Sequence, residues 1–392
     1  MAHFGRDRLA DFLLDPGIRY LNHGTVGATP RAVLAAQQQW RDRIERNPAT
    51  FLFRELTPLH DMPVPERAEL RLAAHEVARR LGGNGDDLVF TDNITAAANA
   101  VLRSLVFGPG DEVLVTDHNY GAITLAAQAV TRGVGALVRT AEMPRYGARP
   151  EAYAAAVDLA IGPRTRLVIV DHITSGSALV LPVEDIVATC RKRGVPILVD
   201  GAHVPGQLPL DLDALGADWY VANLHKWAFA PRSCGFLWAP PHRQTGLHPA
   251  VISWGLDHGF THEFDWVGTR DFTPWLSAPA GFEYLESLGE PAVRQWNHAL
   301  AYGGALVMAA RWGVEFETPE SMIASMATVP LPGSLGSTPE DASRLRDALL
   351  FEDRIEVPVL VRDGRLWIRV CGQVYNEPAE YEALAEAVAK RA

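Results

Sequence analysis

The chain has 392 residues, of which 48% are hydrophobic and 21% are charged, and its formal net charge is −11. This composition is typical of a folded globular protein and excludes disordered, fibrous and membrane chains. Because the charge is negative and no run of Lys or Arg occurs, we expect no nucleic-acid partner, since a phosphate backbone would repel the chain.

Neither a targeting segment nor a membrane span is predicted. The first residues, Met1–Leu14, mix acidic with apolar residues, and no later segment is apolar over the length that a bilayer requires. The cysteines Cys190, Cys234 and Cys371 are too few and too widely spaced for a disulfide framework or a thiolate metal site. We therefore expect a cytoplasmic protein with no membrane anchor and no bound metal.

A helix is predicted to begin near Asn93 and to end at the sequence GPG, residues 108–110. Its apolar residues recur at helical spacing and are Ala98, Val101, Leu102 and Leu105. Asn93 or Thr95 can accept a hydrogen bond from a free N–H of the first turn. The helix would therefore start with polar side chains and bury an apolar stripe.

Four short segments are predicted to be strands: Asp111–Asp117, Arg166–His172, Val195–Gly201 and Asp218–Ala222. Between the second and the third, apolar residues recur at positions 183, 186, 187 and 190, which predicts a helix ending at Gly194. This β–α–β unit predicts an open α/β sheet of parallel strands. Polar residues follow the carboxyl ends of the strands, and ligands bind at that edge of such sheets.

The pattern changes after residue 275, where helical segments extend to about residue 313. Near the end, Val357–Arg362 and Arg365–Val370 flank Asp363-Gly364, which is a strong hairpin signal. On the second strand Leu366, Ile368 and Val370 share one face, and the opposite face carries Trp367, Arg369 and Cys371. We expect a large domain at residues 20–279, a smaller C-terminal α+β domain at 280–392, and an N-terminal segment, 1–19, that packs with the small domain.

The most informative residues follow two of the predicted strands. VDGAH (199–203) carries Asp200, and YVANLHKW (220–227) carries Lys226 among apolar neighbours. A pyridine cofactor with an aldehyde needs both groups: an amine that forms an imine, and an anion that keeps the ring nitrogen protonated. Apolar surroundings lower the pKa of a lysine toward a reactive neutral amine.

A phosphate on such a cofactor needs a separate cradle, and TDNITAAAN (91–99) offers one. Free N–H groups and the helix dipole favour an anion at a helix start, and Thr95 adds a hydroxyl. Asn223 and His225, beside the lysine, are further candidate donors.

At this point the chain resembles the class-V aminotransferase-like group of fold-type-I pyridoxal-phosphate enzymes, and within it the isopenicillin N epimerase-like branch. The resemblance covers nearly the whole chain, through these motifs in order: YLNHGTVGATP (20–30), FLFREL, DNITAAAN, DHNYGA, DHITSG, DGAHVPG, NLHKW, ISWG, VGTRDFTPW and RVCGQVYN (369–376). It implies an α/β fold in which the large domain has a mostly parallel seven-stranded sheet. The implied cofactor is pyridoxal 5′-phosphate.

The resemblance also implies roles around the cofactor. Lys226 would be the imine lysine, Asp200 the partner of the ring nitrogen, and His203 a hydrogen-bond partner near the phenolic oxygen. Tyr120 would stack on the ring, with Asn119 as the alternative. The implied phosphate cradle consists of Thr95, Ala96, Asn223 and His225.

Further roles implied by the resemblance concern a second subunit and the substrate. Gly268 and Thr269 resemble a segment that reaches the phosphate across a dimer interface, which implies a homodimer with shared active sites. Arg369 matches the arginine that binds the α-carboxylate of an amino-acid substrate. The other implied substrate contacts are Asn22, His23, Arg54 and Ser175, a set that suits a second carboxylate or a bulky polar tail.

The chain departs from the family pattern at two positions. Asn223 stands where the branch often has serine before the HK pair, and Cys371 stands where serine is common. Alternation of faces on a strand would let Cys371 project with Arg369. We favour a packing role, because a free cysteine is usually a small buried hydrophobe.

Three reactions at the α-carbon stay open: epimerisation, β-elimination by a C–S lyase, and transamination. All begin with removal of the α-proton, for which Lys226 is the expected base. An epimerase needs a second acid or base, and the candidates are Tyr120, His23 and His172. The segment from Met322 to Ser337 has no cysteine, which argues against a persulfide-forming desulfurase. We expect epimerisation first and a C–S lyase second, over a non-catalytic binding module, and the natural substrate stays open.

Overall fold

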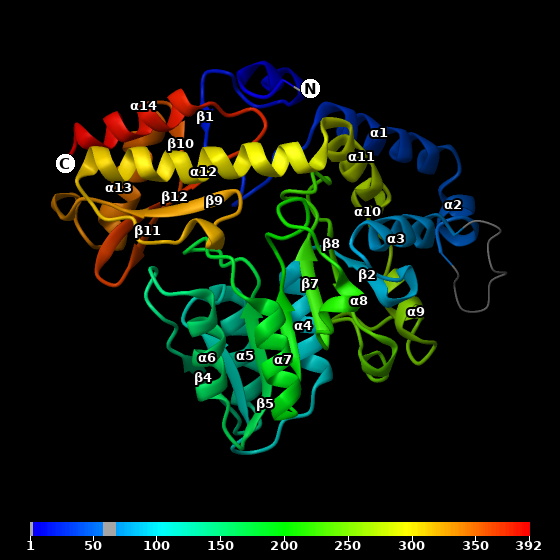
Figure 1. The fold of residues 1–392 in the computed structure, drawn as a ribbon. Helices are drawn as coiled ribbons and strands as arrows, with labels where there is room; N and C mark the ends of the chain where they lie inside the picture. Colours follow the sequence, from blue (N-terminus) through cyan, green and yellow to red (C-terminus); the bar gives the residue numbers. More distant parts are fainter. Residues whose placement is uncertain (1–2, 58–67) are drawn as a thin grey trace.

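The computed structural model describes residues 3–57 and 68–392. These residues form a large sheet with helices on both faces and a smaller sheet beside it (Figure 1). The long helix α12 (Glu290–Trp312) runs along the small sheet and packs against the last helix, α14 (Pro378–Ala389). Within the described residues no helix is both long and apolar enough to span a membrane.

Among the described residues the large sheet has seven strands in the order β2-β8-β7-β6-β5-β3-β4. All neighbouring pairs are parallel except the two that involve β8. The strands are β2 (Leu88–Thr91), β3 (Glu112–Thr116), β4 (Leu137–Ala141), β5 (Thr165–Asp171), β6 (Ile197–Asp200), β7 (Trp219–Asn223) and β8 (Gly235–Trp238). The predicted fold class, with its mostly parallel seven-stranded sheet, is confirmed.

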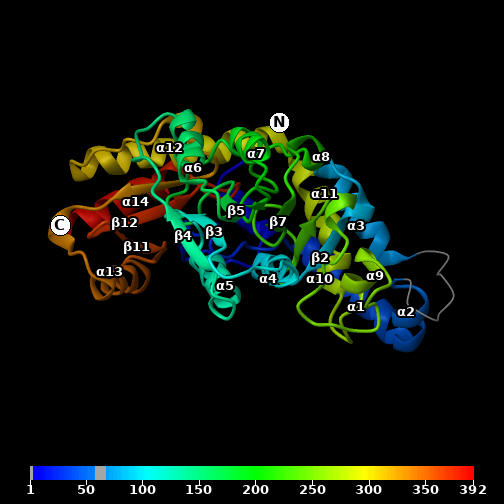
Figure 2. The same cartoon turned by 90° about the horizontal axis from the view of Figure 1, so that it is seen from below.

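Alternation along the strands divides the core of the large sheet into two layers. Leu167 and Ile169 of β5 pack with α4 (Ile94–Ser104) and α5 (Gly121–Arg132). Val168 and Val170 point the other way and join the cluster that includes α6 (Pro150–Ala160) and α7 (Val183–Arg193). Successive side chains of a strand point to opposite faces, so a strand covered on both sides is apolar throughout. Figure 2 shows these helices on either side of the sheet.

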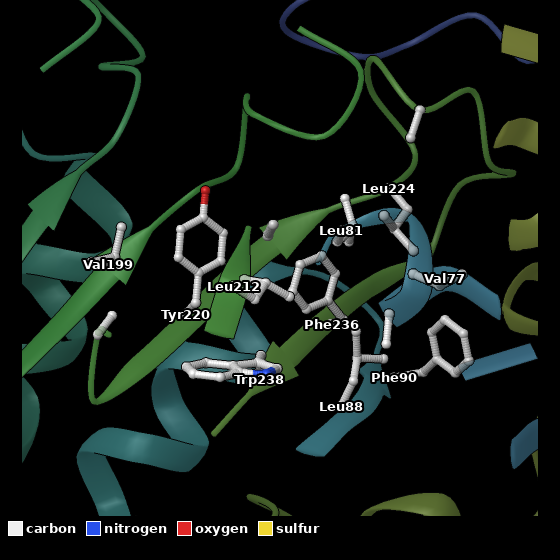
Figure 3. Packing of buried hydrophobic residues seen from close by; sticks show 14 of the residues in the cluster. Val77, Leu81, Leu88, Phe90, Val199, Leu212, Tyr220, Leu224, Phe236 and Trp238 are labelled. Carbon is white, nitrogen blue, oxygen red and sulfur yellow. The ribbon is translucent and has the colours of Figure 1, made fainter. Parts of the chain in front are cut away.

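The layer above β7 and β8 is filled by large side chains (Figure 3). Tyr220 and Phe236 stack with their ring centroids 6.3 Å apart, and Val77 and Leu81 from the region of α3 (Glu69–Arg80) complete the packing. Burial of each such side chain contributes about 1.5–3 kcal/mol. This packing holds β7, and therefore the residues just after it, in a fixed position.

The small sheet is antiparallel, with the order β11-β12-β9. β11 (Val359–Arg362) and β12 (Arg365–Cys371) form the predicted hairpin, and β9 (Met326–Pro330) pairs with the other edge of β12. Both turn residues have positive φ, 51° at Asp363 and 66° at Gly364, as a two-residue hairpin of this class requires. The apolar face of β12 packs on α12, α14 and α13 (Pro339–Phe351).

The N-terminal segment contacts the C-terminal part of the chain. The N–H of Gly5 donates to the carbonyl of Val374 at 2.8 Å, and β1 (Arg19–Tyr20) pairs in parallel with β10 (Ile355–Glu356). The domain limits given above stay a prediction. The remaining helices are α1 (Arg31–Arg46), α2 (Pro48–Arg54), α8 (Leu212–Leu215), α9 (Phe260–Asp265), α10 (Thr273–Leu276) and α11 (Ala278–Leu288).

Candidate active site

A cavity of about 280 Å³ lies where the carboxyl ends of β6 and β7 face β12. It brings together many of the residues singled out from the sequence. The residues of that set that line it are Thr95, Tyr120, Ser175, Asp200, His203, Asn223, His225, Lys226 and Arg369. Segments as far apart in the sequence as Thr95 and Arg369 therefore meet at one edge of the large sheet.

Lys226 follows β7 and reaches into this cavity. The chain has only two other lysines, Lys192 and Lys390, and both are exposed on helices or at their ends. Burial, and secondarily the charge of Arg369, lowers the pKa of Lys226 from 10.5 to about 8. About a tenth of this amine is therefore neutral, and so nucleophilic, at pH 7, far more than for an ordinary lysine.

His203 holds the Lys226 amine from one side, with 3.2 Å between Nε2 and Nζ. The indole N–H of Trp227, which can only donate, is 3.4 Å from Nδ1 of His203. Burial keeps the pKa of His203 well below its usual value, so the ring is neutral. With Nδ1 accepting, the ring proton must lie on Nε2, where it is donated to a neutral lysine amine.

Asp200 ends β6 and is only 2% exposed. Its Oδ1 accepts a hydrogen bond from the N–H of Ala202 at 2.9 Å, but its Oδ2 has no partner among the described residues. Burial raises its pKa to about 6. A buried carboxylate oxygen without a donor is costly, and a protonated ring nitrogen would satisfy it.

Asp171 is a site residue that the sequence reasoning missed. It is the register partner of Asp200 on the next parallel strand and lines the same cavity. Its Oδ1 accepts from Asn119 Nδ2 at 2.7 Å and from the N–H of Tyr120 at 3.4 Å. Burial and the charge of Asp200 hold the pKa of Asp171 well above its usual value. The quoted motif DHITSG contains this residue, but its importance depends on the strand register.

The start of α4 faces the cavity with one unused N–H group. The N–H of Ile94 donates to Asn223 Oδ1, and that of Ala96 donates to the N-cap Asn93, both at 3.0 Å. Within the described chain this leaves the N–H of Thr95, with its hydroxyl, as the free donor of the first turn. Ala96 itself lies beside the cavity without lining it.

Arg369 projects from the polar face of β12 into the cavity and is 4% exposed. Its guanidinium donates to the carbonyl of Ser175 and to the hydroxyl of Thr25, both at 2.6 Å, while Nε has no partner in the part of the chain described. Within the described residues its hydrogen-bond partners are all neutral groups, with no carboxylate among them. A buried cation that is hydrogen-bonded only to neutral groups favours an incoming anion.

Tyr120 precedes α5, is 44% exposed and lines the cavity mouth. Asn119, the alternative to it, turns away from the cavity and donates to Asp171, so it orients the turn that carries Tyr120. His225 lines the cavity and donates its Nδ1 proton to the carbonyl of Cys234 at 2.8 Å. This bond leaves Nε2 as the ring nitrogen that is available to a ligand.

Three residues expected to contact substrate lie outside this cavity. Asn22 donates to Glu356 Oε1 at 2.9 Å, and Arg54 is exposed at the end of α2. Both ring nitrogens of His23 are in contact, Nδ1 with the hydroxyl of Tyr375 at 2.8 Å and Nε2 with the carbonyl of Lys226 at 3.0 Å. His23 therefore holds the backbone of Lys226 in position. A neighbouring candidate acid or base, His172, contacts the Tyr220 hydroxyl and is also outside the cavity.

Gly268 and Thr269 line a separate cavity of about 740 Å³. The neighbouring Arg270 forms an ion pair with Asp92, just before the start of α4, and lies over the ring of Trp275 with 4.1 Å to the centroid. This segment thus approaches the N-terminal end of α4 without entering the first cavity of its own chain.

Cys371 is fully buried in a small apolar cluster with Trp227 and Met326. The N–H of Gly24 donates to its sulfur at 3.2 Å, and burial raises the pKa of the thiol. The thiol therefore packs beneath Arg369 without lining the cavity.

The family model described as aminotransferase class-V matches residues 20–339 of the chain. The chain belongs to this family. The class-V chain is 34% identical over 395 residues to isopenicillin N epimerase of Amycolatopsis lactamdurans, a match that covers 96% of this chain and 95% of the relative. It is 32% identical over 416 residues to putative L-cysteine desulfhydrase 2 of Oryza sativa subsp. japonica. This match covers 96% of this chain and 85% of the relative.

Solved structures agree with the class-V fold. Cysteine desulfurase from Thermococcus onnurineus NA1 superposes with a TM-score of 0.80 at 19% identity, over 100% of this chain and 99% of the other. A C-DES variant with glycine covalently linked to its PLP cofactor superposes with a TM-score of 0.78 at 22% identity. The match covers 99% of this chain and 98% of the other. The class-V chain is thus a pyridoxal-phosphate-dependent enzyme.

The side chains present in the class-V cavity fit this cofactor. The unpartnered Oδ2 of Asp200 suits a protonated pyridine nitrogen, and the neutral amine of Lys226 suits an aldehyde. The free N–H and hydroxyl of Thr95 at the start of α4 suit a phosphate.

Proposed function

We propose that this enzyme epimerises an amino acid at its α-carbon, with Lys226 removing the α-proton. Pyridoxal phosphate supplies the electron sink that makes this proton acidic. Asp200 would hold the ring nitrogen, Lys226 would attach the cofactor, and Thr95, Asn223 and His225 would bind its phosphate, with Ala96 next to them on α4. His203 would hydrogen-bond near the phenolic oxygen, and Tyr120 would lie against the ring.

The observation that carries the proposal is the pairing of a cation with an amine in one cavity. Arg369 has no carboxylate partner among the described residues, so it suits the α-carboxylate of an amino acid. Ser175 and Thr25 orient its guanidinium. A substrate held at that end would bring its α-carbon toward Lys226, whose pKa of about 8 suits a base that works near neutral pH.

Epimerisation also needs a group that returns a proton on the other face of the α-carbon. Of the three candidates, the Tyr120 hydroxyl is the one that lines the cavity, since His23 and His172 are engaged elsewhere. We therefore assign this role to Tyr120.

The alternative is a C–S β-lyase, which needs only one base. The 32% identity to plant L-cysteine desulfhydrase supports it. No thiol lines the cavity within the described residues, which supports a lyase that releases sulfur over one that stores it on a cysteine.

Proton NMR in D₂O of the holoenzyme with single amino acids tests the two reactions. We expect exchange of the α-proton together with growth of the opposite enantiomer, and the Tyr120→Phe variant should exchange without inverting. Release of pyruvate in proportion to the amino acid consumed would favour the lyase. If no amino acid exchanges its α-proton in the wild-type holoenzyme, the proposal fails.

We further propose a homodimer in which Gly268 and Thr269 reach the partner's phosphate site. An exposed apolar segment supports this arrangement, with Trp254 78% exposed and Val251 on the wall of the 740 Å³ cavity. Trp254→Glu should dissociate the dimer in sedimentation experiments and weaken cofactor binding. The control Val106→Glu changes an even more exposed apolar residue elsewhere and should do neither. A wild-type monomer that binds the cofactor fully would contradict the proposal.

A cytoplasmic location belongs to the same proposal. The three cysteines are unpaired, as expected in a reducing compartment. Fractionation of the source cells with an antibody against the chain would test it, and recovery from the medium would contradict it.

A further inference from the structure

A second cavity, of about 400 Å³, adjoins the first. Tyr120 and Ser175 line both, so the two cavities share a wall. The second cavity lies between the turn after β3 and the tip of the β11–β12 hairpin, which contributes Arg362. It is thus bounded by the same two sheets as the first.

The first cavity is too small for the whole of a large substrate. Ligand pockets typically have volumes of about 300–1,000 Å³, and the 280 Å³ here must hold the cofactor ring and the reacting end of an amino acid. With the α-carboxylate on Arg369, next to Ser175, a side chain has the adjoining cavity directly beside it.

Arg362 is the one cationic side chain among the described residues that line the second cavity, and it is 22% exposed. Its two terminal nitrogens lie 3.1 and 2.8 Å from Nδ1 and Nε2 of His118. Burial, together with Arg362, lowers the pKa of His118 to about 3, so the imidazole is neutral and can accept only one of these hydrogen bonds. The guanidinium therefore has donor capacity left over.

Two carboxylates lie near Arg362, but neither is at the distance of a strong ion pair. Asp363 Oδ2 is 3.5 Å from Nε, and Asp117 Oδ2 is 3.8 Å from Nη2, against about 2.7–2.9 Å for a charge-assisted hydrogen bond. Asp363 is exposed, and Asp117 accepts from the N–H of Met143 through its other oxygen, Oδ1. An incoming carboxylate can form the short, direct contact that these two do not.

The walls beside Arg362 are aromatic. Tyr146 stacks on Trp367 with ring centroids 4.8 Å apart, and the guanidinium lies 5.4 Å from the Tyr146 centroid. The Tyr146 hydroxyl is buried and has no acceptor for its proton within the described residues, and burial raises its pKa to about 12, so it keeps that proton. A buried donor without an acceptor is the second feature that favours an acceptor group in this cavity.

We propose that the second cavity receives the substrate's side chain and that Arg362, with the Tyr146 hydroxyl, binds a carboxylate at its end. The substrate class is then an α-amino acid with a second, distal carboxylate. This inference rests on the proposed function, because the α-amino acid must already be held by Arg369 and Lys226.

The test compares two probes of nearly the same shape, S-carboxymethyl-L-cysteine and its amide, S-carbamoylmethyl-L-cysteine, with L-alanine as a probe that has no tail. Binding is followed as a change in the cofactor absorbance of the holoenzyme. We expect the acid to bind at least about tenfold more tightly than the amide, because hydrogen bonds to charged groups are the stronger ones.

The Arg362→Gln variant should lose this preference and bind the two probes within about twofold, while its affinity for L-alanine stays unchanged. Arg362→Lys, which keeps the charge, should retain part of the preference. Arg365→Gln is the matched control, because Arg365 is the register partner of Arg362 on the same hairpin but does not line the cavity. It should behave as the wild type.

Equal binding of acid and amide by the wild type would overturn the inference, and this comparison needs no variant. So would an equal loss of affinity for all three probes in Arg362→Gln, since that would indicate a structural role. A wild-type response to L-alanine but to neither tailed probe would overturn the inference and leave the proposed function intact. If no amino acid changed the cofactor absorbance of the wild type, both the inference and the proposed function would be overturned.

Discussion

The two halves of the proposed site, one for the cofactor and one for the substrate, are built in different ways. The cofactor half lies on consecutive strands of one sheet, with Asp200 ending β6 and Lys226 following β7. The substrate half is assembled from distant segments, because Arg369 of β12 is held by Ser175 and Thr25. We infer that changes in the first half abolish the chemistry, whereas changes in the second half alter which amino acid binds.

The largest effect is expected for Lys226→Ala. Loss of the base should lower the rate by about 10²–10⁴-fold, the range of acid–base catalysis by a positioned side chain. The visible absorbance of the bound cofactor should disappear as well. Lys192→Ala removes an exposed lysine and is the matched control. If Lys226→Ala kept the wild-type rate, the cofactor half would be wrongly assigned.

A different kinetic result is expected for Arg369→Gln in the substrate half. KM should rise about ten- to hundredfold, because a charge-assisted contact to the α-carboxylate is lost, while kcat changes less. Steady-state kinetics with one amino acid separates the two parameters. A fall in kcat at constant KM would mean that Arg369 belongs with the cofactor half.

The pH dependence of cofactor capture tests whether Lys226 is the reactive amine with a lowered pKa. Because the pKa of Lys226 is lowered to about 8, the neutral, reactive amine is scarce below that pH and dominant above it. The rate at which the apoprotein captures pyridoxal phosphate should rise about fiftyfold from pH 6 to pH 8, then by about another twofold, and level off above about pH 9. A rate that continues to rise to pH 10, as for an ordinary lysine, would contradict this environment.

The smallest effect is expected for Asp171→Asn, which keeps the shape but removes a buried ionisable carboxyl group. Asp171 raises the pKa of Lys226, so its replacement should move the midpoint of the capture curve to lower pH. The turnover rate should change by less than about tenfold, because the asparagine can still accept from the Tyr120 N–H. An unchanged midpoint would show that Asp171 does not act on Lys226.

Much of the fold followed from local patterns in the sequence. The runs at Asp111–Asp117 and Val195–Gly201 are strands β3 and β6, because a strand buried on both faces is apolar throughout. Asn93 caps α4 and Gly194 ends α7 with a φ of 67°, as the start and stop signals indicated. Strand β8 was not foreseen, since its four residues carry no periodic signal.

The site was predictable only where a residue's neighbours along the chain define its role. Asp200 ends one strand and Lys226 follows the next, so the edge of the sheet on which they lie could be predicted. Asp171 was missed because its pairing with Asp200 is set by strand register. The burial of His23 behind Lys226 depends on contacts with Tyr375, 352 residues away, that no local pattern reveals.

The central claim is that Lys226 carries the cofactor beside Asp200. Borohydride reduction of the holoenzyme, followed by peptide mass mapping, tests it most directly, because the chain offers only Lys192, Lys226 and Lys390 as attachment points. We expect one pyridoxyl group per chain, on the peptide that contains Lys226. A label on either of the other lysines, or none at all, would contradict the account.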